Sequence, residues 1–180
     1  EAYQNTGNQK SSATPWGART TSTPGGKTTR KKEIMEILAA HRVPYAATAS
    51  PAHPDDLRAK VARALSLRGT RFISVTCPCV PGWGIGDDAS LRVIRLGVES
   101  RVVPLYEIED GVRYRITHRP AGVPVTEYLR SQGRYAHLAE SDVEIIQAEV
   151  DRRWEALADR AARTGDPVVI ERTHTPVRAH

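Results

Sequence analysis

The sequence predicts an α/β fold in which a mostly parallel sheet is flanked by helices. Apolar residues recur at helical spacing over residues 31–41 and over residues 55–67. A short apolar run, typical of a buried strand, follows each of these segments, at residues 43–49 and 71–77. Because the order is helix, strand, helix, strand, the two strands are expected to be parallel and covered by the helices that connect them.

The first two expected helices each have an apolar face that we expect to point toward the core. In residues 31–41 and 55–67 this face consists of Ile34, Ile37, Leu38, His41, Leu57, Val61, Ala64 and Leu65. Gly69 follows the second segment and is expected to end that helix.

The second half of the chain predicts a third helix and a hairpin. The helix is expected over residues 88–99, with Asp88 as its N-cap and with Leu91, Ile94 and Val98 facing inward. Residues 102–109 and 112–117 are expected to be strands, joined by the turn signal Glu109-Asp110-Gly111.

Two more helices are expected to complete the chain. The first is short, over residues 125–132, and Gly133 follows it. The second spans residues 142–162, with Ser141 as N-cap and Glu144 completing a capping box. Its apolar stripe consists of Val143, Ile146, Val150, Trp154, Leu157 and Ala161.

Residues 1–28 precede the regular elements and are expected to be irregular. Asn5 to Gln9 are small or polar, and residues 18–28 are rich in Thr, Pro and Gly. A loop of this length is either functional or disordered, and its composition alone leaves both alternatives open.

Composition narrows the choice of partner. The net charge of +5 fits an acidic surface, a phosphate ligand or nucleic acid. Nucleic acid is not favoured, because the basic residues are spread out without interleaved aromatic residues. The chain shows no apolar run long enough for a membrane span and no visible signal peptide, so we expect no membrane partner. We expect a cytoplasmic location because the spacing of the two cysteines makes a secreted disulfide framework unlikely.

Cys77 and Cys79 follow the second expected strand, at the edge where open α/β sheets bind ligands. A disulfide between residues so close in sequence would be strained. Two alternatives remain: buried, inert thiols, or ligands of a metal centre completed by cysteines from elsewhere, since two are too few for zinc or a cluster. Structural or solvent roles are expected for the six histidines, which are His41, His53, His118, His137, His174 and His180.

Five sequence blocks, in order, resemble one family. They are EAYQNTGNQKSSATPWGARTTSTPGGK, PYAATAS, CPCVPGW, PLYEIEDG and PVTEYLRSQGRYAHL, and they extend from Glu1 to about Trp154. This pattern resembles the C-terminal portion of the beta subunit of 2-oxoacid:ferredoxin oxidoreductases of the pyruvate:ferredoxin oxidoreductase (pyruvate synthase) type. The resemblance implies that the α/β fold is the C-terminal part of a thiamine-diphosphate-binding domain.

The resemblance implies that the first residues bind thiamine diphosphate and Mg²⁺. The main-chain carbonyl of Ala2 would complete the Mg²⁺ shell, in keeping with the preference of Mg²⁺ for oxygen ligands. Asn5 would approach the thiazolium and the substrate as the catalytic residue, where its amide can hydrogen-bond a carbonyl or a developing alkoxide. Thr6 and Gly7 would shape the turn and complete the cofactor-binding set.

The resemblance also implies a 4Fe–4S cluster with Cys79 as its fourth ligand, whereas Cys77 has no counterpart in the family pattern. The other three cluster cysteines and the Gly-Asp-Gly that opens the thiamine signature are absent from this sequence. We therefore expect each cofactor to be shared with an N-terminal part of the subunit, and the isolated chain to be inactive.

The implied reaction is the oxidation of pyruvate with CoA to acetyl-CoA and CO₂, with ferredoxin as electron acceptor. The expected partners are the alpha, gamma and delta subunits, ferredoxin and CoA. Residues 1–118 would belong to the thiamine-diphosphate-binding domain, and residues 119–180 would form a helical tail that packs on another subunit. The alternatives are the same chemistry on branched-chain 2-oxoacids, a non-catalytic truncated interaction module, and a basic RNA- or DNA-binding domain.

Overall fold

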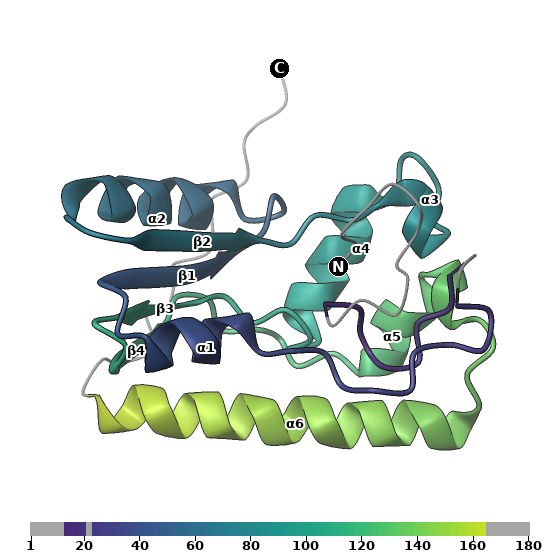
Figure 1. Ribbon diagram of the computed structural model, residues 1–180. Coiled ribbons are helices and arrows are strands. Elements are labelled where there is room, and N and C mark those ends of the chain that lie inside the picture. Colours follow the sequence, from purple (N-terminus) through teal and green to yellow (C-terminus); the bar gives the residue numbers. More distant parts are fainter. Residues whose placement is uncertain (1–12, 21–22, 165–180) are drawn as a thin grey trace.

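A computed structural model describes residues 13–20 and 23–164 of the chain. These residues form one four-stranded sheet flanked by helices, which confirms the predicted α/β class (Figure 1). The strands are β1 (Tyr45–Ala49), β2 (Arg71–Val75), β3 (Tyr106–Glu109) and β4 (Arg113–Ile116), and they lie in the order β2-β1-β3-β4.

The sheet is mixed rather than mostly parallel. The predicted parallel pairing is present between β1 and β2, but β3 pairs antiparallel with both β1 and β4. The predicted hairpin explains the antiparallel pairing of β3 with β4, because a tight turn between two strands requires them to run in opposite directions. Asp110 and Gly111 in this turn both have positive φ, at 52° and 71°.

The five predicted helices are all present, with ends that differ by a few residues from those expected. The helices are α1 (Ile34–Ala40), α2 (Pro54–Ser66), α3 (Val80–Trp83), α4 (Ser90–Glu99), α5 (Val125–Arg130), the 3₁₀ helix η1 (Gly133–Tyr135) and α6 (Glu140–Arg163). The short helices α3 and η1 were not predicted.

Two predicted N-caps are wrong. Asp88 is not the N-cap of α4, which follows Ala89. The N-cap of α6 is Ala139 instead of Ser141, and its N–H donates to the Asp142 carboxylate at 3.0 Å. The Asp142 carboxylate thus satisfies a backbone N–H at the start of the helix. The predicted capping box assigned this role to Glu144 and Ser141.

The predicted inward face of α2 is largely wrong. Val61 and Leu65 are 41% and 77% exposed, whereas Asp56 and Lys60 are buried together with Ala64. The Lys60 ammonium donates to the Asp56 carboxylate at 2.6 Å, so the two charges compensate each other inside the protein. The buried face of this helix therefore contains an ion pair that a count of apolar residues does not reveal.

The predicted inward face of α1 is also partly wrong. Its buried residues are Met35 and Ala39, Ile34 and Leu38 are partly buried, and Ile37 and His41 are exposed. The faces of α4 and α6 were predicted better. In α4, Ile94 and Val98 are buried as predicted, but Leu91 is 57% exposed. The stripe of α6 is confirmed: Val150, Leu157 and Ala161 are buried, and Val143, Ile146 and Trp154 pack against the core clusters.

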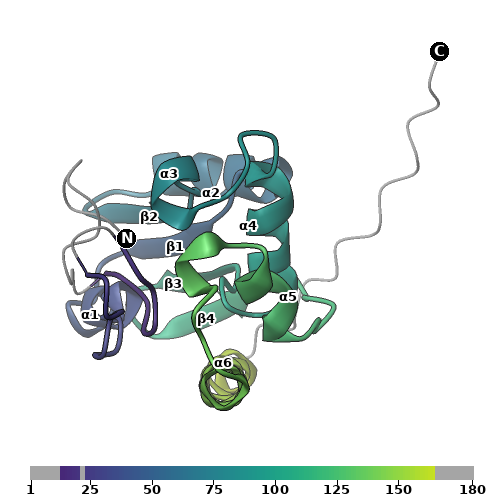
Figure 2. The ribbon, with the colours of Figure 1, turned by 90° about the vertical axis from the view of Figure 1, so that its right-hand side faces the viewer.

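Helix α6 runs along one side of the molecule, next to β4 and α5 (Figures 1 and 2). Its apolar stripe thus packs on its own chain. The predicted division at residue 118 and the contact of residues 119–180 with another subunit stay predictions.

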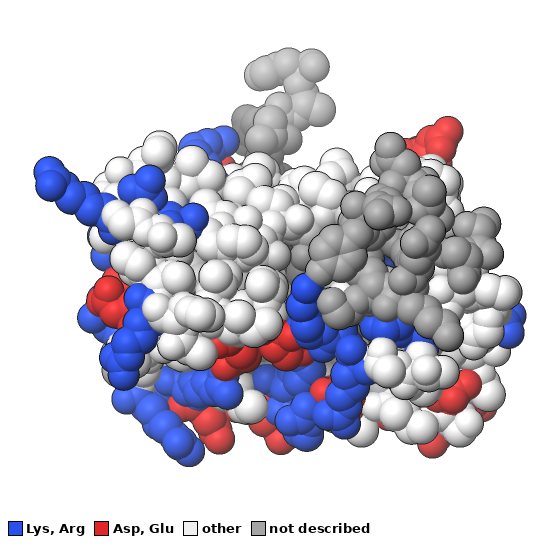
Figure 3. Space-filling view, viewed as in Figure 1, with Lys and Arg blue, Asp and Glu red and all other residues white. Residues whose placement is uncertain are grey.

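Positive and negative side chains are interspersed on the face shown in Figure 3, above all along α6. Several of them form ion pairs between α6 and the region around α1, such as Arg153 with Glu33 at 2.8 Å and Arg160 with Glu36. Among the described residues, no helix is long and apolar enough to cross a membrane.

Candidate functional site

The carboxyl ends of three strands define the edge of the sheet where the candidate site lies. β1 and β2 are parallel, and β4 runs in the same direction because two antiparallel pairings separate it from β1. β2 points toward α3 and α4 in Figure 1. The segments that leave this edge carry Cys77 and Cys79 after β2, His53 after β1 and His118 after β4. Ligands in α/β proteins bind at such edges.

The predicted thiamine-binding residues Ala2, Asn5, Thr6 and Gly7 lie outside the described residues. Their roles stay predictions. The described continuation of the same segment begins at Ala13.

This continuation is packed against the rest of the chain. Thr14 and Ala18 are fully buried, and Lys27 is 3% exposed. The Lys27 ammonium donates to the Thr14 carbonyl at 2.9 Å, and burial lowers the pKa of this lysine. For residues 13–20 and 23–28, the alternative of a disordered tail is therefore wrong.

Both cysteines are exposed, so the alternative of buried, inert thiols is wrong. Cys79 directly precedes α3, and its carbonyl accepts a hydrogen bond from the Trp83 N–H at 2.7 Å. An exposed thiol on a fixed backbone suits a ligand to an iron–sulfur cluster. Since such clusters take four cysteines and this sequence has two, other cysteines would have to complete the set.

Trp83 anchors the cysteine loop in the core. It is 2% exposed, and its ring meets the edge of Tyr128 at a centroid distance of 6.3 Å. The Arg134 guanidinium lies over the same ring, with Cζ at 3.9 Å from the centroid. Next to Trp83, the Gly84 carbonyl accepts a hydrogen bond from the Gly133 N–H at 3.0 Å. The cysteine loop is thus held firmly on η1.

The same short helix also holds the segment that continues from residues 1–12. The Arg19 N–H donates to the Arg134 carbonyl at 2.9 Å. Arg19 and the loop after β2 are far apart in sequence, yet both contact η1. The structure therefore brings together the continuations of the two predicted cofactor-binding segments.

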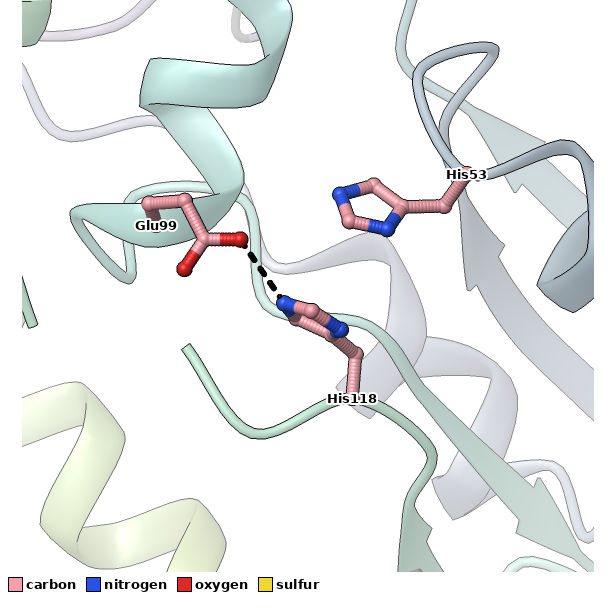
Figure 4. Close-up of side chains that lie close together, drawn as sticks. All are labelled: His53, Glu99 and His118. Carbon is pink, nitrogen blue, oxygen red and sulfur yellow. Dashed lines mark hydrogen bonds and ion pairs between the residues drawn. The ribbon is translucent and has the colours of Figure 1, made fainter. Parts of the chain in front are cut away.

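Three further residues meet at the sheet edge, and sequence reasoning missed them (Figure 4). The His118 ring is hydrogen-bonded to Glu99, with 2.9 Å between Nε2 and Oε1. The His53 ring lies 4.4 Å from the His118 ring, centroid to centroid. Burial, and next the proximity of His118, lower the pKa of His53. The expectation of separate structural or solvent roles for His53 and His118 overlooked this cluster, whose only sequence signal is that both residues follow strands.

A groove of about 600 Å³ lies between α1, α6 and residues 101–106. Neither the cysteines nor the three clustered residues line it. Its lining does include Trp16 and Thr28 of the N-terminal segment and Tyr135 of η1, so the groove borders the region where that segment packs.

Comparison with known proteins finds related oxidoreductase subunits. The chain is 47% identical over 163 residues to pyruvate synthase subunit PorB of Methanocaldococcus jannaschii, an alignment that covers 87% of this chain and 54% of that protein. It is 46% identical over 168 residues to PorB of Thermotoga maritima, covering 87% and 52%. It is 42% identical over 165 residues to ketoisovalerate oxidoreductase subunit VorB of Pyrococcus abyssi, covering 87% and 53%.

The chain spans about half the length of the curated relatives it matches. No protein-family model matches it. Over the aligned residues the chain is homologous to the PorB and VorB subunits, which confirms the family resemblance that its motifs predicted.

Proposed function

We propose that this chain is part of the thiamine-diphosphate-binding subunit of a 2-oxoacid:ferredoxin oxidoreductase. The complex would oxidise pyruvate with CoA to acetyl-CoA and CO₂ and reduce ferredoxin. The observation that supports this proposal best is the packing of residues 13–20 and of the Cys79 loop on the same helix, η1. A thiamine site and a cluster that exchange electrons must be close together, and this packing suits that requirement.

Each cofactor would have named ligands in this chain. Ala2, Asn5, Thr6 and Gly7 would hold thiamine diphosphate and its Mg²⁺, and Cys79 would hold the 4Fe–4S cluster. Thiamine diphosphate, when bound, supplies the carbanion-stabilising chemistry that decarboxylation of a 2-oxoacid needs. The protein would orient the substrate through the Asn5 amide and fix the cluster ligand through the Trp83 anchor. The other subunits of the complex, ferredoxin and CoA would be the partners, and residues 119–180 would contribute to the contact with another subunit.

The cluster assignment can be tested with the two neighbouring cysteines as a matched pair. In the assembled complex, we expect Cys79→Ala to lose the signal of one 4Fe–4S cluster in electron paramagnetic resonance, together with ferredoxin reduction. Cys77→Ala should keep both, because Cys77 is exposed but has no counterpart in the family pattern. An intact cluster in Cys79→Ala would contradict the assignment and would favour a non-catalytic module.

Asn5 can be tested by turnover. If its amide stabilises charge that develops on the substrate, Asn5→Ala should lower kcat by about 10²–10³-fold, the usual effect of removing such a donor. The melting temperature of the complex should stay unchanged. Unchanged turnover would remove Asn5 from the site.

The substrate is proposed as pyruvate, with a branched-chain 2-oxoacid as the alternative. The relatives include both pyruvate synthase and ketoisovalerate oxidoreductase subunits, at similar identity. A hydrophobic pocket discriminates about 10–200-fold for each methylene group. We therefore expect kcat/KM for pyruvate to exceed that for 2-oxoisovalerate at least about 10-fold, and the reverse order would favour the alternative.

A further inference from the structure

His53, Glu99 and His118 come from three separate elements and converge at the sheet edge (Figure 4). His53 precedes α2, Glu99 is the last residue of α4, and His118 follows β4. Their nearest nitrogen and carboxylate atoms all lie within 4.8 Å of one another. Two imidazoles and one carboxylate form a common set of ligands for a transition-metal ion.

The polar atoms of this cluster are only partly satisfied. His53 Nε2 is buried and has no hydrogen-bond partner in the part of the chain that the structure describes. A buried ring nitrogen without a partner is costly, so its presence calls for an explanation. A bound cation would give this nitrogen a partner.

Glu99 is already oriented for such a role. Its Oε1 faces His118 Nε2 at 2.9 Å, and its Oε2 accepts a hydrogen bond from the Ala121 N–H at 2.6 Å. The Glu99 carbonyl also accepts hydrogen bonds from the N–H groups of Gly122 and Val123, at 2.9 and 3.1 Å. Metal ligands are typically fixed by such outer hydrogen bonds.

We propose that His53, Glu99 and His118 bind a divalent transition-metal ion, with Zn²⁺ as the expected occupant. Zinc bonds of about 2.0–2.1 Å in tetrahedral geometry place ligand atoms about 3.4 Å apart. The His118 Nε2 and Glu99 Oε1 atoms are 2.9 Å apart and all three ligand atoms lie within 4.8 Å of one another, so rotations of the side chains would bring them to this spacing. Ca²⁺ and Mg²⁺ are disfavoured, because they prefer ligand sets made of oxygen atoms.

The surroundings suit a partly solvated ion. The His118 and Glu99 side chains are 19% and 23% exposed, which leaves access for the metal and for a water molecule as fourth ligand. Glu99 and Asp56 contribute negative charge near His53, and Arg95 opposes it. On binding, the ion would replace the proton that lies between His118 and Glu99.

The bound ion would join the connection between β1 and α2, the end of α4 and the connection between β4 and α5. The site uses neither cysteine and none of the predicted thiamine ligands. It is therefore independent of the proposed function, and the two can fail separately.

The test measures zinc in the assembled complex by mass spectrometry, after removal of loosely bound metal and reconstitution with ZnCl₂. We expect one more zinc per subunit in the parent protein than in His53→Ala or His118→Ala. His41→Ala is the matched control, because this imidazole is exposed and lies outside the cluster, and it should retain the metal. Cys79→Ala should also retain it, which separates this site from zinc bound in a damaged cluster site.

Glu99→Gln keeps the shape of the side chain and covers the case in which an alanine variant fails to fold. In a chelator competition we expect this variant to weaken zinc affinity by at least about 10-fold. Even residues that only hydrogen-bond a metal ligand usually change metal affinity by this much when they are mutated. After Co²⁺ replaces zinc, the visible absorption bands of the bound ion should be present in His41→Ala and absent in His118→Ala. Equal zinc content and affinity in the parent protein and all cluster variants would overturn the proposal.

Discussion

Loss of the Asp56 carboxylate is expected to destabilise the fold strongly, because it leaves a buried ammonium without its counter-ion. The side chains of Lys60 and Asp56 are 0% and 4% exposed, and their charged atoms are 2.6 Å apart. Among the described residues Lys60 has one other hydrogen bond, to the uncharged Thr117 hydroxyl at 2.7 Å, and the Glu107 carboxylate, which also favours the charged form of Lys60, is paired with Arg115 at 2.7 Å. Removing one partner of a buried ion pair typically costs about 3–5 kcal/mol. We expect Asp56→Ala to lower the free energy of unfolding by this amount.

Asp55→Ala is the matched control for this variant. Asp55 lies in the same first turn of α2 and pairs with Arg58 at 2.6 Å, but the two side chains are 56% and 76% exposed. An exposed pair contributes about 0–1 kcal/mol, so the control should change stability by no more than that. Both variants lose an acidic group near the helix N-terminus, and the comparison therefore cancels the effect of the helix dipole.

The assay is urea denaturation of the full-length subunit, followed by tryptophan fluorescence. The double variant Asp56→Leu/Lys60→Met removes both charges and should recover most of the lost stability, since apolar side chains of similar volume often replace buried pairs without loss. If Asp56→Ala costs no more than Asp55→Ala, the account of a buried, mutually dependent pair is wrong.

The same variant should show a characteristic pH dependence. Burial lowers the pKa of Lys60 from its ordinary value of 10.5. The unfolded chain therefore binds more protons than the folded chain between the lowered pKa and 10.5, and stability rises with pH in that window. The rise should be steeper in Asp56→Ala, where the favourable carboxylate is absent, than in the parent protein. A flat profile would indicate that Lys60 reaches water in the variant.

Two other predictions concern the hairpin and the anchor of the cysteine loop. Gly111→Ala should lower the free energy of unfolding by about 1–3 kcal/mol, because Gly111 has a φ of +71° and a Cβ at this position would clash with a carbonyl of α1. Gly25→Ala is the control: a Cβ at Gly25 meets no atom within 4 Å, so this variant should be close to neutral in the same denaturation assay. Arg134→Met should lower the free energy of unfolding by about 2 kcal/mol, because the Arg134 guanidinium is buried over Trp83, with Cζ at 3.9 Å from the ring centroid. In the control Arg101→Met the lost guanidinium lies 5.5 Å from the Trp154 ring centroid, and the loss should be less than about 1 kcal/mol. Equal losses would contradict the role of Arg134.

Much of the architecture could be predicted from local sequence patterns. The hairpin turn at Asp110-Gly111 was predicted because few residues adopt positive φ readily. The apolar stripe of α6 was predicted because its spacing follows the helical repeat over many turns. Such features depend on residues close together in the chain.

The candidate site was predicted only in part. The position of Cys79 just beyond β2 was predicted from strand order, and the structure agrees, whereas its exposure was left open by the sequence. The anchoring of that loop through the contact of Arg134 with Trp83 could not be predicted, because Arg134 and Trp83 lie far apart in sequence. The roles of Ala2, Asn5, Thr6 and Gly7 come from the family resemblance alone, since these residues lie outside the described part of the chain.

The sequence by itself determined the α/β class, the helix and strand order, and the homology to PorB and VorB subunits, because these depend on local periodicity and on ordered motifs. Only the tertiary structure decided that α2 buries Lys60 with Asp56 and that His53, Glu99 and His118 meet at one edge of the sheet. The physical reason is that strand pairing and helix packing decide which distant residues come within reach. The end of β4 brings the Thr117 hydroxyl to Lys60, beside its helix neighbour Asp56, and the same edge of the sheet brings His53, Glu99 and His118 together.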